Sequence, residues 1–329
     1  MIPGPAIPGP LGMGGAPLGN LFNRIPEHVA AATVQAGWDA GIRHFDTAPH
    51  YGAGLSELRM GAVLRQHPRD EFFVSSKIGR RLVPAAAVPD PDQGFFGALP
   101  FRRVVDYSAA GTVRSIEDSL ARMGLNRLDI VYIHDVSEDW HGPEWKQRFR
   151  EAMTGAAKVL TAMRSRGEIK AWGLGVNLVD PCLAALEHAA PDVFLVAGRY
   201  TLLDHSALKQ LFPACAKRGV KVVLGGPYNS GLLAGGTTFN YETAPPDMAA
   251  RARAIGAVCA RHGVDLKSAA LQFCAAHPVV ATVIPGARTP GEVRENAALM
   301  AAPIPGALWS ELKREGLLPK EAPTPHPES

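Results

Sequence analysis

Short apolar segments alternate with segments of helical periodicity along nearly the whole of this 329-residue chain. This alternation restricts the fold more than any other feature of the sequence. The apolar segments are rich in Val, Ile, Leu and Phe, which is typical of strands buried on both faces of a parallel sheet. Eight strands are predicted, at Leu11–Ala16, Ile42–Asp46, Phe72–Ser76, Leu128–His134, Ala171–Val176, Val193–Ala197, Val220–Gly225 and Val280–Ile284.

Helices are predicted between these strands. The first, Pro26–Ala40, has Pro in its first turn and Gly41 just after its end, which are the usual start and stop signals. The other predicted helices are Ser56–Gln66, Thr112–Met123, Glu144–Arg166, Pro181–Ala189, His205–Arg218, Pro246–His262, Leu266–Ala276, Pro290–Met300 and Ala307–Glu315.

This pattern predicts an α/β fold, a (β/α)8 barrel of the TIM type, formed as a single domain over residues 1–329. A doubly wound sheet is the competing fold, but no G-x-G-x-x-G follows the first strand. The longest loop runs from Ile78 to about Gly111, and its aromatic residues favour an ordered pocket wall. The Pro-rich tail, about residues 318–329, is expected to be flexible.

Charge and composition exclude several functional classes. The net charge is +3, from 34 basic and 31 acidic residues without a basic stripe, so nucleic acid is not an expected partner. No apolar segment approaches the roughly 20 residues of a membrane helix, and the N-terminus lacks the basic and apolar regions of a signal peptide. We therefore expect a cytoplasmic protein without a membrane partner. The oligomeric state stays open, a homo-oligomer included.

The four cysteines lie far apart in the sequence. None forms a CxxC pair, and each has apolar neighbours. They are interpreted as reduced core residues, so neither a disulfide framework nor a metal site is expected.

Polar side chains stand at the carboxyl ends of three strands, where (β/α)8 barrels build their active sites. Asp46 and Tyr51 follow the second strand, Lys77 the third, and His134 ends the fourth. Lys77 would lower the pKa of Tyr51, Asp46 would neutralise a buried Lys77, and His134 would polarise a carbonyl. Such a set suits an oxygen that gains or loses a proton while carbon exchanges a hydride with a cofactor.

Each of these residues also has an ordinary structural interpretation. Asp46 could be a helix cap, Lys77 a surface residue, and His134 a core histidine with satisfied hydrogen bonds. Their joint occurrence on successive strand ends favours catalysis.

The stretch from Gly41 to Gly52, Gly-Ile-Arg-His-Phe-Asp-Thr-Ala-Pro-His-Tyr-Gly, resembles the signature of the aldo-keto reductases. Four further motifs continue the resemblance in the same order, over roughly residues 10–300: Val74–Lys77, Ile133-His134, Gly173–Val176 and Ile284–Pro290. The resemblance implies that Tyr51 is the general acid/base, that Lys77 and Asp46 tune it, and that His134 orients the carbonyl.

Other stretches resemble one bacterial branch of that family. Ala16–Asn20, Asp46–Tyr51, His134-Asp135 and Pro227–Ala234 are similar to aldose 1-dehydrogenases, L-fucose dehydrogenases and pyridoxal 4-dehydrogenases. Because sugar-catabolic reductases of 6-oxo sugars share this branch, the direction of the reaction stays open.

The resemblance also implies a nicotinamide cofactor, NADP or NAD, extended across the barrel mouth. Many family members have basic residues for the 2′-phosphate where this chain has Gly286 and Glu292, which favours NAD, whereas Arg288 could bind a phosphate. The aromatic residue that commonly stacks on nicotinamide falls near Gly225, and Tyr228 is the candidate replacement. The predicted cofactor-binding residues are Asn177, Tyr228, Asn229, Ser230, Gly231, Leu232, Gly286, Arg288, Thr289, Glu295 and Asn296.

Loops after the strands are expected to bind the substrate. Trp140, His141, Phe95 and Phe96 are the candidates, since an aromatic face beside hydrogen-bonding groups suits a sugar, although Trp140 could equally pack a helix start. The expected enzyme is an NAD(P)-dependent oxidoreductase that transfers a hydride between nicotinamide and a polar carbonyl or aldose in carbohydrate metabolism. A broad-range NADPH aldehyde reductase is one alternative, and a cofactor-sensing regulatory subunit is another.

Overall fold

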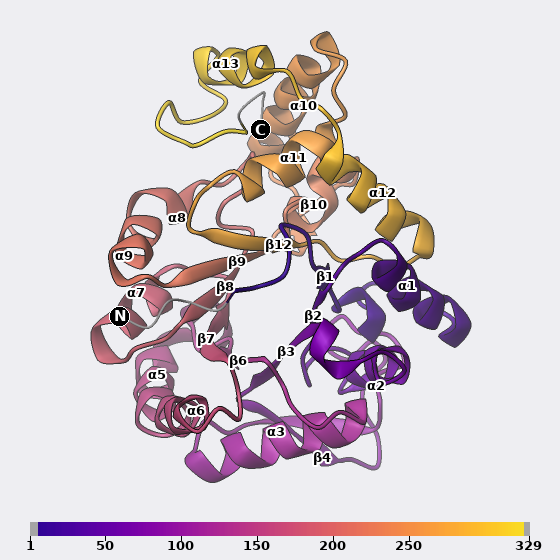
Figure 1. Cartoon of the computed structure of the whole chain (residues 1–329), viewed down its shortest axis with the longest axis vertical. Coiled ribbons are helices and arrows are strands. Elements are labelled where there is room, and N and C mark those ends of the chain that lie inside the picture. The colour runs from indigo at the N-terminus through magenta and orange to yellow at the C-terminus, as the bar shows by residue number, and fades with distance from the viewer. Residues whose placement is uncertain (1–5, 326–329) are drawn as a thin grey trace.

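The computed structural model describes residues 6–325. Within them, one sheet of eight parallel strands lies at the centre of the molecule, in the order β1-β2-β3-β6-β7-β8-β9-β12 (Figure 1). The strands are β1 (Met13–Gly14), β2 (His44–Asp46), β3 (Phe73–Ile78), β6 (Ile130–His134), β7 (Ala171–Val176), β8 (Val193–Ala197), β9 (Lys221–Gly225) and β12 (Val280–Ile284).

The last strand returns to the first, so the sheet closes into a barrel. Parallel bridges join Leu11 to Val283 and Gly14 to Gly286. The Gly12 N–H donates to the Val283 carbonyl at 2.8 Å. The predicted (β/α)8 barrel is confirmed, and the doubly wound alternative is excluded because an open sheet would leave both edges unpaired.

Helices surround the strands (Figure 1). The ring is completed where the helix after β12 packs against the helix after β1. The longer helices are α1 (Glu27–Asp39), α2 (Leu55–Leu64), α3 (Ala109–Met123), α5 (Trp145–Thr154), α6 (Ala156–Ser165), α7 (Asp180–His188), α9 (Leu211–Arg218), α10 (Pro246–Arg261), α11 (Leu266–Ala275), α12 (Pro290–Ala301) and α13 (Gly306–Arg314).

Two predicted helices are each divided in two. The helix predicted over 144–166 breaks at Gly155, whose backbone lies so close to the Tyr107 carbonyl that an added Cβ would come within 2.5 Å of its oxygen. The helix predicted over 205–218 becomes α8 (Ser206–Lys209) and α9. Pro213 explains this second break, because its ring would clash with the carbonyl of Lys209 in a continuous helix.

The segment predicted as a loop from Ile78 to about Gly111 contains an antiparallel ribbon. Strand β4 (Arg80–Pro84) pairs with β5 (Phe101–Val105). Neither strand was predicted, because Pro84 ends β4, Pro100 precedes β5, and the apolar residues of both strands do not alternate with polar ones. The loop between them places Phe95, 3% exposed, against the rings of His50 and Tyr51.

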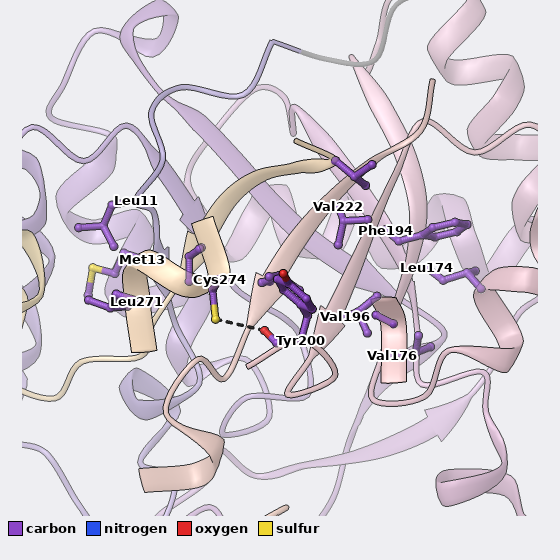
Figure 2. Packing of buried hydrophobic residues seen from close by; sticks show 14 of the residues in the cluster. Leu11, Met13, Leu174, Val176, Phe194, Val196, Tyr200, Val222, Leu271 and Cys274 are labelled. Atoms are coloured by element: carbon purple, nitrogen blue, oxygen red, sulfur yellow. Dashed lines mark hydrogen bonds between the residues drawn. The ribbon is translucent and has the colours of Figure 1, made fainter. Parts of the chain in front are cut away.

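Side chains of the strands alternate between the barrel interior and the helix layer. In β6, Ile130, Tyr132 and His134 face inward, whereas the neighbouring side chains join the core under the helices. Figure 2 shows part of that outer core, with Leu174, Val176, Phe194, Val196 and Val222 packed together. The same alternation turns Asp46, Ser75 and Lys77 into the interior.

The tail expected to be flexible from about residue 318 is anchored at its beginning. Leu318 and Ala322 belong to the buried core, and the Leu318 N–H donates to the Leu312 carbonyl at 3.2 Å. These two side chains pack the beginning of the Pro-rich segment against the core, and the flexibility of the tail stays a prediction from the sequence. Residues 326–329 lie outside the described part of the chain.

Gly173 in β7 allows β8 to approach closely, which generates a first prediction. A Cβ at this position would lie 1.6 Å from the Val193 carbonyl oxygen. We expect Gly173→Ala to lower the free energy of unfolding by about 3 kcal/mol in urea titrations. Gly256→Ala is the control, since its Cβ would meet only Leu266 Cδ2 at 3.7 Å in a helix. Equal stability of the two variants would contradict the assigned packing.

Candidate active site

A buried ion pair lies where β2 and β3 end. Lys77 Nζ donates to Asp46 Oδ2 at 2.6 Å and to the Thr47 carbonyl at 2.8 Å. The other carboxylate oxygen accepts a hydrogen bond from Ser75 Oγ at 2.7 Å. Both charged side chains are at most 2% exposed. Each charge therefore has the partners that a buried ion requires.

Tyr51 lies beside this ion pair, with Lys77 Nζ 4.8 Å from the centroid of its ring. Burial raises the pKa of Tyr51 well above its usual value, the charges of Asp46 and Asp135 raise it further, and Arg80 lowers it. Burial outweighs the lowering of this pKa that is expected from Lys77, so the net shift is upward. Tyr51 is thus a neutral phenol at pH 7, suited to donate a proton.

His134 ends β6 on the inner face of the barrel. Its ring meets the Tyr51 ring edge-on, with 6.0 Å between centroids. Burial lowers the pKa of His134 well below 6.5, and the charges of Lys77 and Arg80 add to this effect. The Nε2 atom lies 3.3 Å from Asp135 Oδ2. This contact is not a hydrogen bond, so a neutral imidazole with its proton on Nε2 can donate that proton to a ligand oxygen without carrying charge.

Two cavities meet at Tyr51. The first, of about 420 Å³, extends from Asp46 to Asn296 and is called the Asn296 cavity here. The second, of about 500 Å³, lies over His134 and Trp140 and is called the Trp140 cavity. Tyr51 and Tyr241 line both cavities. Tyr51 therefore faces two adjoining cavities.

The predicted cofactor residues lie in three places: along the Asn296 cavity, beside the neighbouring hollows, and outside the cavities. Most of them line the Asn296 cavity: Tyr228, Ser230, Gly231, Gly286, Arg288, Glu295 and Asn296. Asn177 lines the Trp140 cavity, and Asn229 lies beside both on a smaller hollow with Gly226. Leu232 and Thr289 lie outside these cavities, since Leu232 packs in the core and Thr289 caps α12 by accepting the Glu292 N–H.

The predicted substrate residues divide in the same way. Trp140 and Phe95 line the Trp140 cavity. His141 and Phe96 line neither cavity. The His141 ring is turned to Tyr107, whose hydroxyl lies 3.0 Å from Nε2, and the Phe96 backbone is paired with Asn20. Sequence adjacency failed here because neighbouring residues of a loop point in different directions.

The Asn296 cavity has a surface suited to an extended ligand with phosphates. Six glycines contribute backbone instead of side chains to its lining: Gly14, Gly15, Gly225, Gly226, Gly231 and Gly286. The turn after β9 is left-handed, with φ of 57° at Ser230 and 106° at Gly231. At its start, the buried side-chain amide of Asn229 has no hydrogen-bond partner among the described residues. These features fit a dinucleotide held by backbone groups and amides.

The expected aromatic replacement near the nicotinamide position is not where the sequence placed it. Tyr228 Oη donates to Asn296 Oδ1 at 2.6 Å, so this ring lies toward the far end of the Asn296 cavity. Tyr241 is an aromatic residue that lines the Asn296 cavity together with Tyr51. It stands on the turn between β10 (Thr238–Phe239) and β11 (Glu242–Thr243), which the sequence did not reveal.

Three charged or titratable residues at the site were not predicted as functional. Arg80 Nη2 donates to Asp135 Oδ2 at 2.8 Å, and Arg80 Nη1 lies 3.5 Å from His50 Nδ1. The Arg80 guanidinium also stacks on Trp140 at 3.8 Å. His50 and Asp135 each adjoin a predicted catalytic residue, which was a usable signal. For Arg80 the sequence offered no such signal, because this residue begins β4, a strand that was not predicted.

Comparisons with known proteins agree with this geometry. The model of the aldo/keto reductase family matches residues 10–314. The chain is 38% identical to pyridoxal 4-dehydrogenase of Microbacterium luteolum over 322 residues, 94% of each protein. It is 40% identical to D-threo-aldose 1-dehydrogenase of a Pseudomonas species over 325 residues, 96% of each.

Solved structures share the fold. The holo form of an aldo-keto reductase from Bacillus halodurans superposes with a TM-score of 0.71 at 23% identity, covering 97% of this chain and 95% of that one. The glycerol dehydrogenase of Gluconobacter oxydans also reaches 0.71, at 22% identity, covering 99% and 97%.

The fold and the site define an oxidoreductase built on a (β/α)8 barrel, with a tyrosine, a lysine, an aspartate and a histidine around one point of the mouth. The chain belongs to the aldo/keto reductase family, as its sequence predicted, and is an NAD(P)-dependent enzyme. Within the described residues, no helix could cross a membrane. No group of three or more His, Cys, Asp or Glu side chains there is placed to hold a metal ion.

The buried ion pair yields a second prediction. Removing one partner leaves an uncompensated charge in the barrel, so we expect Lys77→Met to lower the free energy of unfolding by about 3–5 kcal/mol. Changing both residues, Lys77→Met with Asp46→Leu, should restore most of this loss, because no lone charge remains. Urea titrations of both variants measure the difference. If Lys77→Met is as stable as the unchanged protein, Lys77 and Asp46 do not form a buried, charged pair.

Proposed function

We propose that this enzyme transfers a hydride between nicotinamide and a polar carbonyl compound, an aldose or a related aldehyde, while Tyr51 transfers the proton. The meeting of two cavities at Tyr51 is the observation that supports this proposal most directly. One cavity runs from Asp46 to Asn296 and is lined in part by six glycines, which suits a dinucleotide, and the other contains His134, Asp135 and Trp140. When bound, the nicotinamide ring supplies or accepts the hydride.

In this proposal the residues around Tyr51 prepare the proton transfer. Tyr51 Oη gives its proton to the carbonyl oxygen in reduction and takes one from the hydroxyl in oxidation. Asp46 holds the Lys77 ammonium beside the ring, and this cation favours negative charge on the phenol oxygen as the proton leaves. His134 Nε2–H donates a hydrogen bond to the same substrate oxygen. Because His134 is neutral, it orients that oxygen without competing as an acid.

The composition of the Trp140 cavity supports a polar substrate. Trp140 is 40% exposed and presents an aromatic face, backed by the Arg80 guanidinium. Asp135, Asp139 and Asn177 contribute hydrogen-bonding groups to the same cavity. An aromatic face for C–H groups and polar groups for hydroxyls suit a sugar or a polar ring. The relatives named as aldose and pyridoxal dehydrogenases act on compounds of this kind.

NAD is the proposed preferred cofactor. Glu292 lines the Asn296 cavity, and its Oε1 lies 3.4 Å from Nη2 of the Arg288 guanidinium. Its Oε2 accepts a hydrogen bond from the backbone N–H of Arg288 at 2.7 Å. The cation that could bind a 2′-phosphate therefore already has a carboxylate partner. A carboxylate at this position repels a phosphate and can accept a hydrogen bond from a ribose hydroxyl.

We also propose that the enzyme works in the cytoplasm. Its four cysteines are all buried and free, which suits a reducing compartment. A homo-oligomer remains a prediction from the sequence.

The third prediction tests the reaction itself. Nicotinamide absorbance is followed with each cofactor, in both directions, on aldoses, 6-oxo sugars, pyridoxal and simple aldehydes. We expect turnover on a polar substrate and a loss of at least about 100-fold in kcat with Tyr51→Phe, which removes the proton donor. Oxidation should accelerate as the pH rises, because it needs the deprotonated form of a group whose pKa is raised, whereas reduction should stay level through neutral pH.

Other outcomes favour the alternatives. Turnover on simple aldehydes with NADPH and no preference for hydroxylated substrates would favour the broad-range aldehyde reductase. Cofactor binding without turnover on any compound would favour the regulatory subunit. Unchanged turnover of Tyr51→Phe would refute the proposed mechanism.

The fourth prediction concerns the cofactor. Glu292→Gln removes the negative charge and frees Arg288, so we expect kcat/KM for NADP to rise at least about tenfold relative to that for NAD. Glu187→Gln changes an exposed carboxylate on α7 and should leave this ratio unaltered. The proposal fails if Glu292→Gln also leaves the ratio unaltered.

A further inference from the structure

Asp135 is a buried carboxylate to which the mechanism above gives no role. It follows His134 directly and its residue is 4% exposed. Its N–H extends the β6–β7 ladder by donating to the Gly175 carbonyl at 2.9 Å, yet its backbone has a φ of 48°. A residue other than glycine adopts this conformation only when its surroundings impose it, and such positions concentrate at functional sites.

The surroundings of Asp135 hold one of its two oxygens. Oδ2 accepts a hydrogen bond from Arg80 Nη2 at 2.8 Å and lies 3.3 Å from His134 Nε2. Arg80 is itself fixed between this carboxylate and the Trp140 ring. The guanidinium therefore neutralises Asp135 and sets the direction in which its other oxygen points.

The second oxygen, Oδ1, accepts no hydrogen bond from the described residues and is not among their fully buried atoms. Since Asp135 lines the Trp140 cavity, the free face of the carboxylate is turned to the space beside Tyr51 and His134. Burial raises the pKa of Asp135 to about 7, with Arg80 acting in the opposite direction. Oδ1 therefore has no donor among the described residues and is open to the cavity, where a ligand hydroxyl would supply one.

The position of the reacting carbonyl oxygen limits which hydroxyl of the substrate can reach Asp135. The substrate carbonyl oxygen must lie about 3 Å from both Tyr51 Oη and His134 Nε2. Asp135 is adjacent to His134 Nε2, so its partner must be a group within a few ångströms of the carbonyl oxygen. A hydroxyl on the carbon next to the carbonyl meets this condition, since the two oxygens of such a pair approach to about 3 Å.

Resting on the proposed function, we propose that Asp135, held by Arg80, is the specificity-determining residue that accepts a hydrogen bond from the hydroxyl neighbouring the reacting carbonyl. The substrate then binds through two oxygens, the carbonyl at Tyr51 and His134 and the hydroxyl at Asp135. An aldehyde without that hydroxyl leaves a buried carboxylate unpaired beside an oxygen that becomes negative. The cavity rejects it for this reason.

The test compares substrates that differ in one hydroxyl. The pairs are 2-hydroxypropanal against propanal and D-arabinose against 2-deoxy-D-ribose. We expect the unchanged enzyme to favour the hydroxylated member by at least about 100-fold in kcat/KM. In Asp135→Asn the amide oxygen turns to Arg80 and the amide N–H₂ faces the cavity, so the acceptor is lost. We expect the ratio to fall toward unity, chiefly through lost activity on the hydroxylated member.

Glu138→Gln is the matched control, because it removes an exposed carboxylate three residues away that lines neither cavity. It should keep the ratio of the unchanged enzyme. The ratio does not depend on how much of a preparation is folded, so a less stable variant still gives an answer.

Three results would overturn the inference. An unchanged enzyme that turns over aldoses without selecting the 2-hydroxyl would refute the role of Asp135 and leave the proposed function standing. Equal losses on both members of a pair in Asp135→Asn would mean that Asp135 only positions His134. Absence of turnover on every aldehyde would refute the proposed function and, with it, this inference.

Discussion

The ion pair between Lys77 and Asp46 is the interaction on which the rest of the site depends. An ammonium and a carboxylate at most 2% exposed can persist together only if each finds its full set of partners. Ser75 Oγ and the Thr47 carbonyl complete those sets. The partners come from the ends of two adjacent parallel strands, so the register of β2 on β3 fixes the electrostatics at Tyr51.

The barrel mouth divides its tasks between rigid strand ends and less regular loops. The strand ends and the turn after β2 place Tyr51, the Lys77–Asp46 ion pair and His134. The loops place further side chains around the two cavities. The β4–β5 ribbon brings Arg80 against Asp135, and the loop after β9 brings Tyr241 over the junction of the two cavities. A change of substrate can thus arise in the loops without disturbing the buried charges.

Sequence reasoning located the elements that have strong periodicity or strong stop signals. All eight barrel strands were found, and α1 ends one residue before its predicted end. It missed the ribbon at Arg80, because the apolar residues of its strands do not alternate with polar ones and prolines lie among them. It also chose the wrong neighbours at Trp140 and Phe95, because His141 and Phe96 turn away from the cavity. Such failures occur where the direction of a side chain depends on contacts distant in the sequence.

The sequence by itself determined the closed barrel, the family and the four polar residues that meet at its mouth, because apolar periodicity and strand-end motifs are local signals. Only the tertiary structure decided the burial of these residues and which other side chains lie beside them. Burial raises the pKa of Tyr51 although a lysine is near, and it lowers the pKa of His134. Arg80 meets Asp135 across 55 residues of chain. Both results depend on how segments pack in space, which no local pattern records.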